Sequence, residues 1–114
     1  MTDALPMPTA AALAELEASA APAARLLQLF ANEQRLILMC RLSEGECAVG
    51  ELAGYAGLSQ SACSQHLARL RDAGVIAPRR EAQTIYYGIS DPAAARLIAL
   101  LCDIYRDKPK DPAP

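Results

Sequence analysis

The chain has no apolar run that approaches the roughly 18 residues needed for a membrane-spanning helix. Its start also lacks the basic segment followed by an apolar segment that is typical of a secretory signal peptide. The chain contains a single histidine, His66, and no cluster of carboxylates that could form an acid–base centre. These absences predict a cytoplasmic protein that does not bind a membrane and is not an enzyme.

We also expect no structural disulfides. Four cysteines in a chain of 114 residues without an export signal indicate a reducing compartment, where thiols stay free unless they bind metal or sense redox state. A hydrophobic content of 53% is enough for one domain with its own core. We expect disordered ends at residues 1–8 and 107–114, which are rich in proline, and one folded domain at residues 9–106.

Charge is distributed unevenly along this weakly acidic chain. The overall net charge is −2, but residues 58–87 carry four arginines against two acidic residues and contain no lysine. Residues 1–57 carry three basic residues against seven acidic ones. A local excess of arginine is typical of a small basic surface, so the bulk acidity does not exclude DNA as a partner.

Apolar spacing predicts a mainly helical fold. One helical stretch begins at Thr9 and restarts or kinks at Pro22, because proline suits the first turn of a helix and breaks an interior one. Asn32 and Asp91 are expected to cap later helices. The remaining helices are predicted at residues 32–42, 48–57, 59–73 and 91–105.

The same spacing gives each helix an apolar series, and on the third of these helices it defines an inward stripe of Cys63, Leu67 and Leu70. The other apolar residues at helical spacing are Leu36, Met39, Cys40 and Leu42 in the first, Val49, Leu52 and Tyr55 in the second, and Leu97, Leu100, Leu101 and Ile104 in the last. The stretch "VIAPRREAQTIYYGIS" changes to β-branched and aromatic residues, which predicts a hairpin with "RREAQ" as its charged turn. The order predicts an α+β winged helix-turn-helix domain with about five helices and a two-stranded wing.

The helix at residues 59–73 is expected to read DNA. In a helix-turn-helix the second helix lies in the major groove, where glutamine can bind adenine and serine can bind bases or phosphates. Its outward face is polar and almost uncharged, and the hairpin tip is expected to reach phosphates or the minor groove. The predicted DNA-binding residues are Gln60, Ser61, Ser64, Gln65 and Arg69 on the helix, and Arg79, Arg80 and Gln83 on the hairpin.

The blocks "LSQSACSQHLARLRDAGVI" and "RREAQTIYY" resemble the ArsR-type winged-helix repressors, and the resemblance covers roughly residues 25–106. It implies a homodimer formed through the first and last helices, an operator with twofold symmetry, and release from DNA by an effector. A dimer would also cover the apolar terminal helices, which a domain of this size cannot bury alone. The two recognition helices would then lie about 34 Å apart.

The usual metal sites of that family are missing. Ala48 and Gly50 stand where members that bind soft metals carry a Cys-x-Cys pair, and the last helix lacks the histidines of the zinc sensors. Cys63 and His66 have a spacing that could ligate zinc, but Cys63 belongs to the predicted inward stripe. No metal or other cofactor is therefore expected.

The similarity is greatest to the sulfide- and oxidant-responsive BigR/SqrR-like branch, which implies a redox switch at Cys40 and Cys102. Cys40 matches the first thiol of that branch, whereas the second position is occupied by Arg106 and Cys102 lies one turn earlier, about 6 Å back along the helix. Arg106 at i+4 could favour the Cys102 thiolate, and Glu44 at i+4 could raise the pKa of Cys40. Two inert, buried cysteines are the alternative.

Two further interpretations stay open. The effector could be a soft metal or metalloid held by Cys40 or Cys102 together with Cys47, which we expect in an exposed loop. The domain could instead be a protein-interaction winged helix that does not bind DNA. The leading interpretation is a cytoplasmic, dimeric, DNA-binding repressor whose effector is a reactive sulfur species or an oxidant.

Overall fold

The computed structural model describes residues 5–106. The predicted disordered ends lie largely outside that range, and only residues 5–8 of them are described, with neither helix nor strand. None of the helices in the described part is long and apolar enough to cross a membrane. The elements along the chain are α1 (Ala10–Ala18), α2 (Ala20–Phe30), α3 (Glu33–Leu42), β1 (Cys47–Ala48), α4 (Val49–Ala56), α5 (Gln60–Asp72), β2 (Ile76–Glu81), β3 (Thr84–Ile89) and α6 (Pro92–Tyr105).

The predicted winged helix-turn-helix fold is confirmed, with one helix more than expected. The first helical stretch is divided at Ser19, where the backbone leaves the helical conformation, and Pro22 lies in the first turn of α2. Thr9 caps α1 by accepting a hydrogen bond from the amide of Ala12 at 3.1 Å. Proline is accepted near a helix start because its missing N–H is not needed there, so the division at Ser19 removes any conflict with Pro22.

Helix α3 begins as predicted, and most but not all of its apolar series faces the core. The Asn32 side chain accepts a hydrogen bond from the Arg35 amide at 3.0 Å and caps the helix. Leu38, Met39 and Leu42 are buried, whereas Cys40 is exposed. Cys40 belongs to the apolar series of the helix but does not face the core, because Leu38 takes the inward position.

Helices α4 and α5 form the helix-turn-helix. Gly57 ends α4 with φ 69° and ψ 33°, a left-handed conformation that glycine adopts without steric cost, and Ser59 caps α5. Cys63, Leu67 and Leu70 have no exposed surface, which confirms the predicted inward stripe of α5. Of the apolar residues of α4, Leu52 is fully buried, whereas Tyr55 is 54% exposed.

The wing belongs to a three-stranded antiparallel sheet in the order β1-β3-β2. The two-residue strand β1 was not predicted, and it pairs Cys47 with Tyr87 of β3. The hairpin turn is also shorter than predicted, because Arg80 pairs with Ile85 and Glu81 with Thr84, which leaves only residues 82 and 83 at the tip. Arg79 and Arg80 are consequently strand residues and not tip residues.

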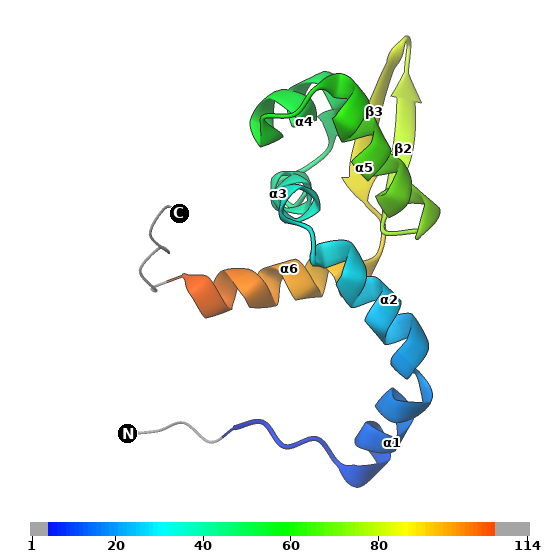
Figure 1. Cartoon of the computed structure of the whole chain (residues 1–114), viewed down its shortest axis with the longest axis vertical. Helices are drawn as coiled ribbons and strands as arrows, with labels where there is room; N and C mark the ends of the chain where they lie inside the picture. The colour runs from blue at the N-terminus through cyan, green and yellow to red at the C-terminus, as the bar shows by residue number, and fades with distance from the viewer. Residues whose placement is uncertain (1–4, 107–114) are drawn as a thin grey trace.

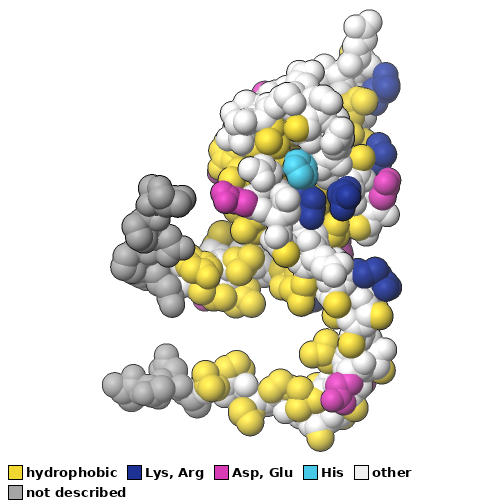
Figure 2. Space-filling view, in the orientation of Figure 1, with side chains coloured by type: hydrophobic (Ala, Val, Ile, Leu, Met, Phe, Trp, Pro, Cys, Tyr) yellow, Lys and Arg dark blue, Asp and Glu magenta, His cyan; other side chains and the backbone are white. Residues whose placement is uncertain are grey.

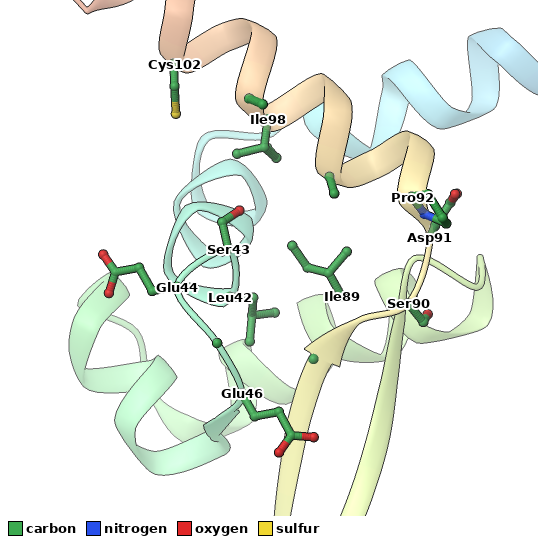
Figure 3. Close-up of a pocket in the computed structure, with 14 residues that line it drawn as sticks. Leu42, Ser43, Glu44, Glu46, Ile89, Ser90, Asp91, Pro92, Ile98 and Cys102 are labelled. Atoms are coloured by element: carbon green, nitrogen blue, oxygen red, sulfur yellow. The ribbon is translucent and has the colours of Figure 1, made fainter.

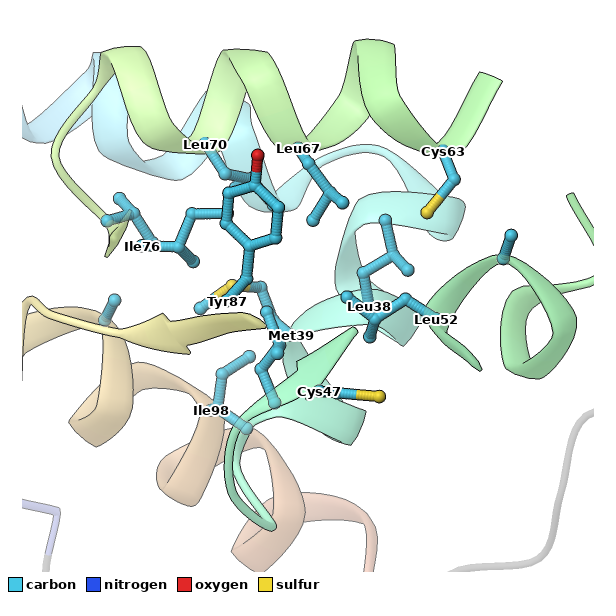
Figure 4. Packing of buried hydrophobic residues seen from close by; sticks show 14 residues of the cluster. Leu38, Met39, Cys47, Leu52, Cys63, Leu67, Leu70, Ile76, Tyr87 and Ile98 are labelled. Carbon is cyan, nitrogen blue, oxygen red and sulfur yellow. The ribbon is translucent and has the colours of Figure 1, made fainter. Parts of the chain in front are cut away.

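The core lies between α3, α4, α5, the sheet and the first half of α6 (Figure 4). Figure 1 shows α1, α2 and the second half of α6 extending away from the compact part formed by α3 to β3. Asp91 caps α6 as predicted, and Ala94 and Ile98 are its buried residues. Leu100 and Ile104 are 54% and 42% exposed, so the apolar side of the second half of α6 is not covered by residues 5–106.

Candidate nucleic-acid interface and thiol pair

The outward face of α5 presents the polar side chains that the sequence predicts. Gln60, Ser61, Ser64 and Gln65 are all exposed, while the opposite face of the helix fills the core. The Ser59 hydroxyl accepts a hydrogen bond from the Ala62 amide at 3.1 Å and fixes the first turn of α5. The buried face of α5 therefore anchors the helix in the core, and its exposed polar face is free to contact a partner.

Basic side chains follow this face toward the end of α5. Arg69 is exposed and has no carboxylate within ion-pair distance in residues 5–106, whereas Arg71 lies 3.5 Å from Asp72. In Figure 2 the arginine side chains gather along one side of the view, over the hairpin, α5 and α2, and apolar side chains gather on α1, α2 and α6. The arginine side chains and most of the apolar side chains of α1 and α6 thus occupy different parts of this face.

The wing arginines differ from each other. The Arg79 guanidinium contacts Glu46 at 2.9 Å and lies over the Tyr86 ring, 5.0 Å from its centroid. The hydrogen bond to Glu46 raises the pKa of Arg79 above its usual value. Arg80 is exposed and has no carboxylate partner among the described residues. Arg80 and the tip residue Gln83 are therefore more available to a ligand than Arg79 is.

Sequence reasoning missed the role of Arg35, which joins three helices. Its Nε donates to the carbonyl of Leu29 at 2.9 Å, Nη2 donates to the carbonyl of Gln28 at 3.4 Å, and Nη1 lies 3.4 Å from Nδ1 of His66. The signal was present in the spacing, because Arg35 stands three and four residues before the buried Leu38 and Met39. A charged residue on an inward helical face requires hydrogen-bond partners.

His66 faces Arg35 and packs beside α3. Partial burial, followed by the nearby charges of Arg35 and Arg69, lowers the pKa of His66 below its usual value. Cys63 is fully buried in the core. Within residues 5–106 no group of three His, Cys, Asp or Glu side chains comes together in a way that could hold a metal ion.

The cysteines fall into two classes. Cys47 and Cys63 are buried, whereas Cys40 on α3 and Cys102 on α6 are exposed. The prediction that Cys47 lies in an exposed loop is wrong, because Cys47 is part of strand β1 and is only 2% exposed. Burial raises the pKa of the Cys47 and Cys63 thiols, which disfavours the reactive thiolate.

The Cys102 thiol lies near enough to Cys40 to affect the pKa of Cys40. Partial burial and, after it, the negative charge of the Cys102 thiolate raise the pKa of the Cys40 thiol. Figure 3 shows Cys102 pointing from α6 toward the end of α3, into a cavity of about 700 Å³. A raised pKa for Cys40 was expected from Glu44, but the cause is different, since Glu44 lies 3.7 Å from Arg41.

Arg106, which was expected to favour the Cys102 thiolate, is paired with a carboxylate. Arg106 forms an ion pair with Asp103, one residue beyond Cys102. The Arg106 charge is therefore partly neutralised at the place where it was expected to favour the Cys102 thiolate. Cys102, Asp103 and Arg106 also line a second, smaller cavity of about 540 Å³ at the end of α6.

Comparisons with known proteins agree with this geometry. Residues 32–77 match the family described as "Bacterial regulatory protein, arsR family". The transcriptional activator HlyU of Vibrio cholerae is 46% identical over 93 residues, which cover 82% of this chain and 86% of HlyU. The structure of reduced HlyU has a TM-score of 0.75 and 46% identity, covering 80% of this chain and 96% of HlyU.

Two further similarities concern a repressor and a dimer. The biofilm growth-associated repressor of Agrobacterium fabrum is 42% identical over 82% of this chain and 80% of its own length. The homodimeric winged helix-turn-helix DNA-binding domain Mb0332 of Mycobacterium bovis has a TM-score of 0.67 and 27% identity, covering 94% of this chain and 100% of that domain. The family match at residues 32–77 contains α3, α4 and α5, including the polar face of α5, and ends at the start of β2.

Proposed function

The chain belongs to the ArsR family of bacterial regulatory proteins, and from that premise we propose that it is a dimeric transcriptional repressor whose operator affinity depends on the oxidation state of Cys40 and Cys102. One observation carries the choice of thiols. Cys40 on α3 and Cys102 on α6 are exposed, whereas the other two cysteines are buried. An oxidant or a reactive sulfur species can therefore reach this pair without opening the core.

DNA binding is assigned to the free face of α5 and to the wing. Gln65 and Ser61 lie one turn apart on the exposed side of α5, where side chains can approach base edges in the major groove. Gln60 and Ser64 flank them, and Arg69 continues the face toward phosphates. On the wing, Arg80 and Gln83 approach the DNA directly, and Arg79 has to exchange Glu46 for a phosphate.

A homodimer is the assembly that this surface favours. Leu27 on α2 and Leu100 and Ile104 on α6 are large apolar side chains with 42% to 58% exposure, which is uncommon on a monomeric surface. A second copy that packs on α2 and α6 would cover them and leave α5 and the wing free. A twofold dimer presents two recognition helices to an operator with matching symmetry.

The thiol chemistry consists of a bridge between α3 and α6. Each thiol loses its proton, the oxidant takes two electrons, and a bond forms between the two Sγ atoms. With a polysulfide, one thiolate takes up a sulfane sulfur while the shortened polysulfide leaves, and the second thiolate joins the resulting persulfide in a trisulfide while a second polysulfide accepts the two electrons and is cleaved to shorter sulfide species. A direct bridge requires Cα atoms about 4.4 to 6.8 Å apart. Closing it would pull α6, which carries the apolar dimer surface, against α3 and change the spacing of the two recognition helices.

The proposal is tested by operator binding of reduced and oxidised protein. DNA duplexes that bind the reduced wild-type protein are selected from a random pool, and affinity is measured before and after treatment with hydrogen peroxide or a polysulfide. We expect at least about tenfold weaker binding after treatment, which corresponds to about 1.4 kcal/mol. Mass spectrometry should find Cys40 and Cys102 bridged within one protomer, with two hydrogens lost and, after polysulfide treatment, one sulfur gained as well.

Single substitutions identify the responding thiols. Cys40→Ser and Cys102→Ser should each abolish the response, and Cys47→Ala, a change at a buried thiol, should retain it. Equal affinity of the reduced and oxidised wild-type protein would contradict the switch. A metal adduct that a chelator removes would indicate the soft-metal alternative, for which residues 5–106 offer no three-ligand cluster.

The DNA-reading assignment has its own test. Replacing Gln65 with Ala should cost about 1 to 3 kcal/mol and relax the base preference at one position of each half-site, because a bidentate contact is lost. Arg80→Gln should weaken binding to all sequences alike. Unchanged affinity in both variants would favour a winged helix that binds protein and not DNA.

A further inference from the structure

The described arginines divide into those with a carboxylate partner and those without. Within residues 5–106, the arginines that lie within 4.0 Å of a carboxylate oxygen are Arg41, Arg71, Arg79 and Arg106. The arginines without such a partner in the same part of the chain are Arg25, Arg35, Arg69, Arg80 and Arg96. Arg25, Arg35 and Arg69 line a single cavity, although they come from α2, α3 and α5.

The cavity has a volume of about 590 Å³ and opens where the end of α2 meets the second half of α5. Its walls are otherwise apolar or neutral, apart from Asp91. The Oδ1 atom of Asp91 accepts a hydrogen bond from the Ala93 amide at 2.9 Å and caps α6. One carboxylate that is engaged elsewhere faces three guanidinium groups, so the cavity carries excess positive charge.

Arg35 is held in this cavity by neutral partners alone. The carbonyls of Gln28 and Leu29 and the His66 ring fix its guanidinium, and none of them carries a negative charge that could offset it. Burial and the charge of Arg69 lower the pKa of Arg35, as expected for a cation without a counter-ion. Arg25, which is exposed at the cavity mouth, is free to close on an anion.

We propose that this cavity, which we call the arginine pocket and define by Arg25, Arg35 and Arg69, binds a backbone phosphate of the operator. The inference rests on the proposed DNA-binding function and adds a contact outside the helix-turn-helix and the wing. Guanidinium groups bind phosphate oxygens in a bidentate manner, which suits a site built from arginines.

The position of the pocket identifies DNA as the source of the phosphate. Arg69 lies four residues after Gln65, one helical turn farther along the exposed side of α5. A helix in the major groove is bordered by sugar-phosphate backbones on both sides. In Figure 1 the hairpin tip lies beyond one end of α5 and α2 beyond the other, so the wing and the arginine pocket can hold two separate backbone segments.

The salt dependence of DNA binding tests the pocket, because each neutralised phosphate releases counter-ions. Binding to the selected duplex and to an unrelated duplex is measured at several salt concentrations for the wild-type protein and for Arg25→Gln. The variant should lower the slope of log Kobs against log salt by about 0.9 for each pocket, which is about two for a dimer. It should weaken both duplexes by a similar factor, at least about tenfold at low salt.

Two matched variants separate a specific contact from a general loss of charge. Arg96→Gln removes an exposed arginine of α6 that also lacks a carboxylate partner among the described residues, and it should leave the slope close to that of the wild type. Arg25→Lys retains the charge and should restore most of the slope. Circular dichroism and sedimentation confirm that each variant is folded and dimeric.

The outcomes are distinguishable from failure of the proposed function. If the wild-type protein binds no duplex, the repressor function fails. If it binds and Arg25→Gln keeps the wild-type slope, the arginine pocket does not hold DNA and the inference is overturned. Shifts of the pocket amides by inorganic phosphate together with an unchanged slope would also overturn it, and would identify a site for a small anion.

Discussion

The part of the chain from α3 to β3 and the terminal helices α1, α2 and α6 have similar apolar side chains but bury them very differently. The α3 to β3 part contributes Leu38, Leu52, Leu67 and Leu70, none of which is exposed. Helices α1 and α2 contribute no buried residue at all. The core thus lies in the α3 to β3 part together with Ala94 and Ile98 of α6, whereas α1, α2 and the second half of α6 leave large apolar side chains exposed.

This difference separates folding from assembly. Substitutions in the α3 to β3 part should change the stability of each protomer, and substitutions on the terminal helices should change the association of two protomers. The thiol pair joins the two parts, since Cys40 belongs to α3 and Cys102 to α6. Comparing side chains of similar chemistry in the two parts tests whether stability and association are separated in this way.

The largest effect on stability is expected for Leu67→Ala. The side chain is completely buried against α3 and α4, so its truncation leaves a cavity and should lower the free energy of unfolding by about 3 kcal/mol. Leu100→Ala, at a side chain that is 54% exposed, should change the stability of the monomer by less than about 0.5 kcal/mol. Urea unfolding at low protein concentration measures both, and similar losses would contradict the division.

The next effect concerns association. Leu100→Asp places a charge in the expected interface of both protomers and should raise the dimer dissociation constant by about 100-fold, or about 2.7 kcal/mol. Tyr55→Asp is the matched control, because Tyr55 is also 54% exposed but lies on α4. Sedimentation should find monomers for the first variant and dimers for the second. Dimers in both cases would mean that α6 is not the interface.

The two classes of cysteine should differ by a smaller amount. Cys63→Ser places a hydroxyl without a partner in the core and should cost about 1 to 3 kcal/mol of stability. Cys40→Ser, at an exposed position, should cost less than about 0.5 kcal/mol and act only on the response to oxidants. Thermal unfolding of the reduced proteins distinguishes the two, and a large loss for Cys40→Ser would assign that thiol to the core.

The smallest effect is the acid sensitivity of the contact between α3 and α5. The pKa of His66 is lowered in the folded protein from the ordinary value of 6.5, so protons prefer the unfolded chain. Stability should therefore be complete above pH 6.5 and decrease as the pH falls below it. His66→Gln should flatten this part of the pH profile. An unchanged profile in the variant would show that His66 does not contribute.

Much of the fold could be predicted from the sequence because the signals were local. Asn32, Ser59 and Asp91 are caps with short-range geometry, and Gly57 marks the left-handed end of α4. Apolar spacing also gave the inward stripe of α5 correctly. What the spacing could not resolve was the choice between adjacent faces, as at Cys40, where Leu38 is the residue that packs inward.

The errors share a physical cause, namely contacts between residues distant in sequence. Strand β1 exists because Cys47 pairs with Tyr87, and Arg79 is held by Glu46, 33 residues away. The hydrogen bonds of Arg35 to α2 and its contact with His66 likewise depend on how helices pack. The DNA-reading roles of the α5 residues and the switch at Cys40 and Cys102 remain predictions, which the experiments above address.

The edge position of β2 limits how two copies can join. Strand β2 has a neighbour on one side only, and its exposed sequence contains Pro78 followed by two arginines. Proline has no amide hydrogen to donate, and like charges repel when two such edges approach. The sheet therefore resists extension from one molecule into the next. The wing consequently does not pair with the wing of a neighbouring copy, even when many copies are bound along the same DNA.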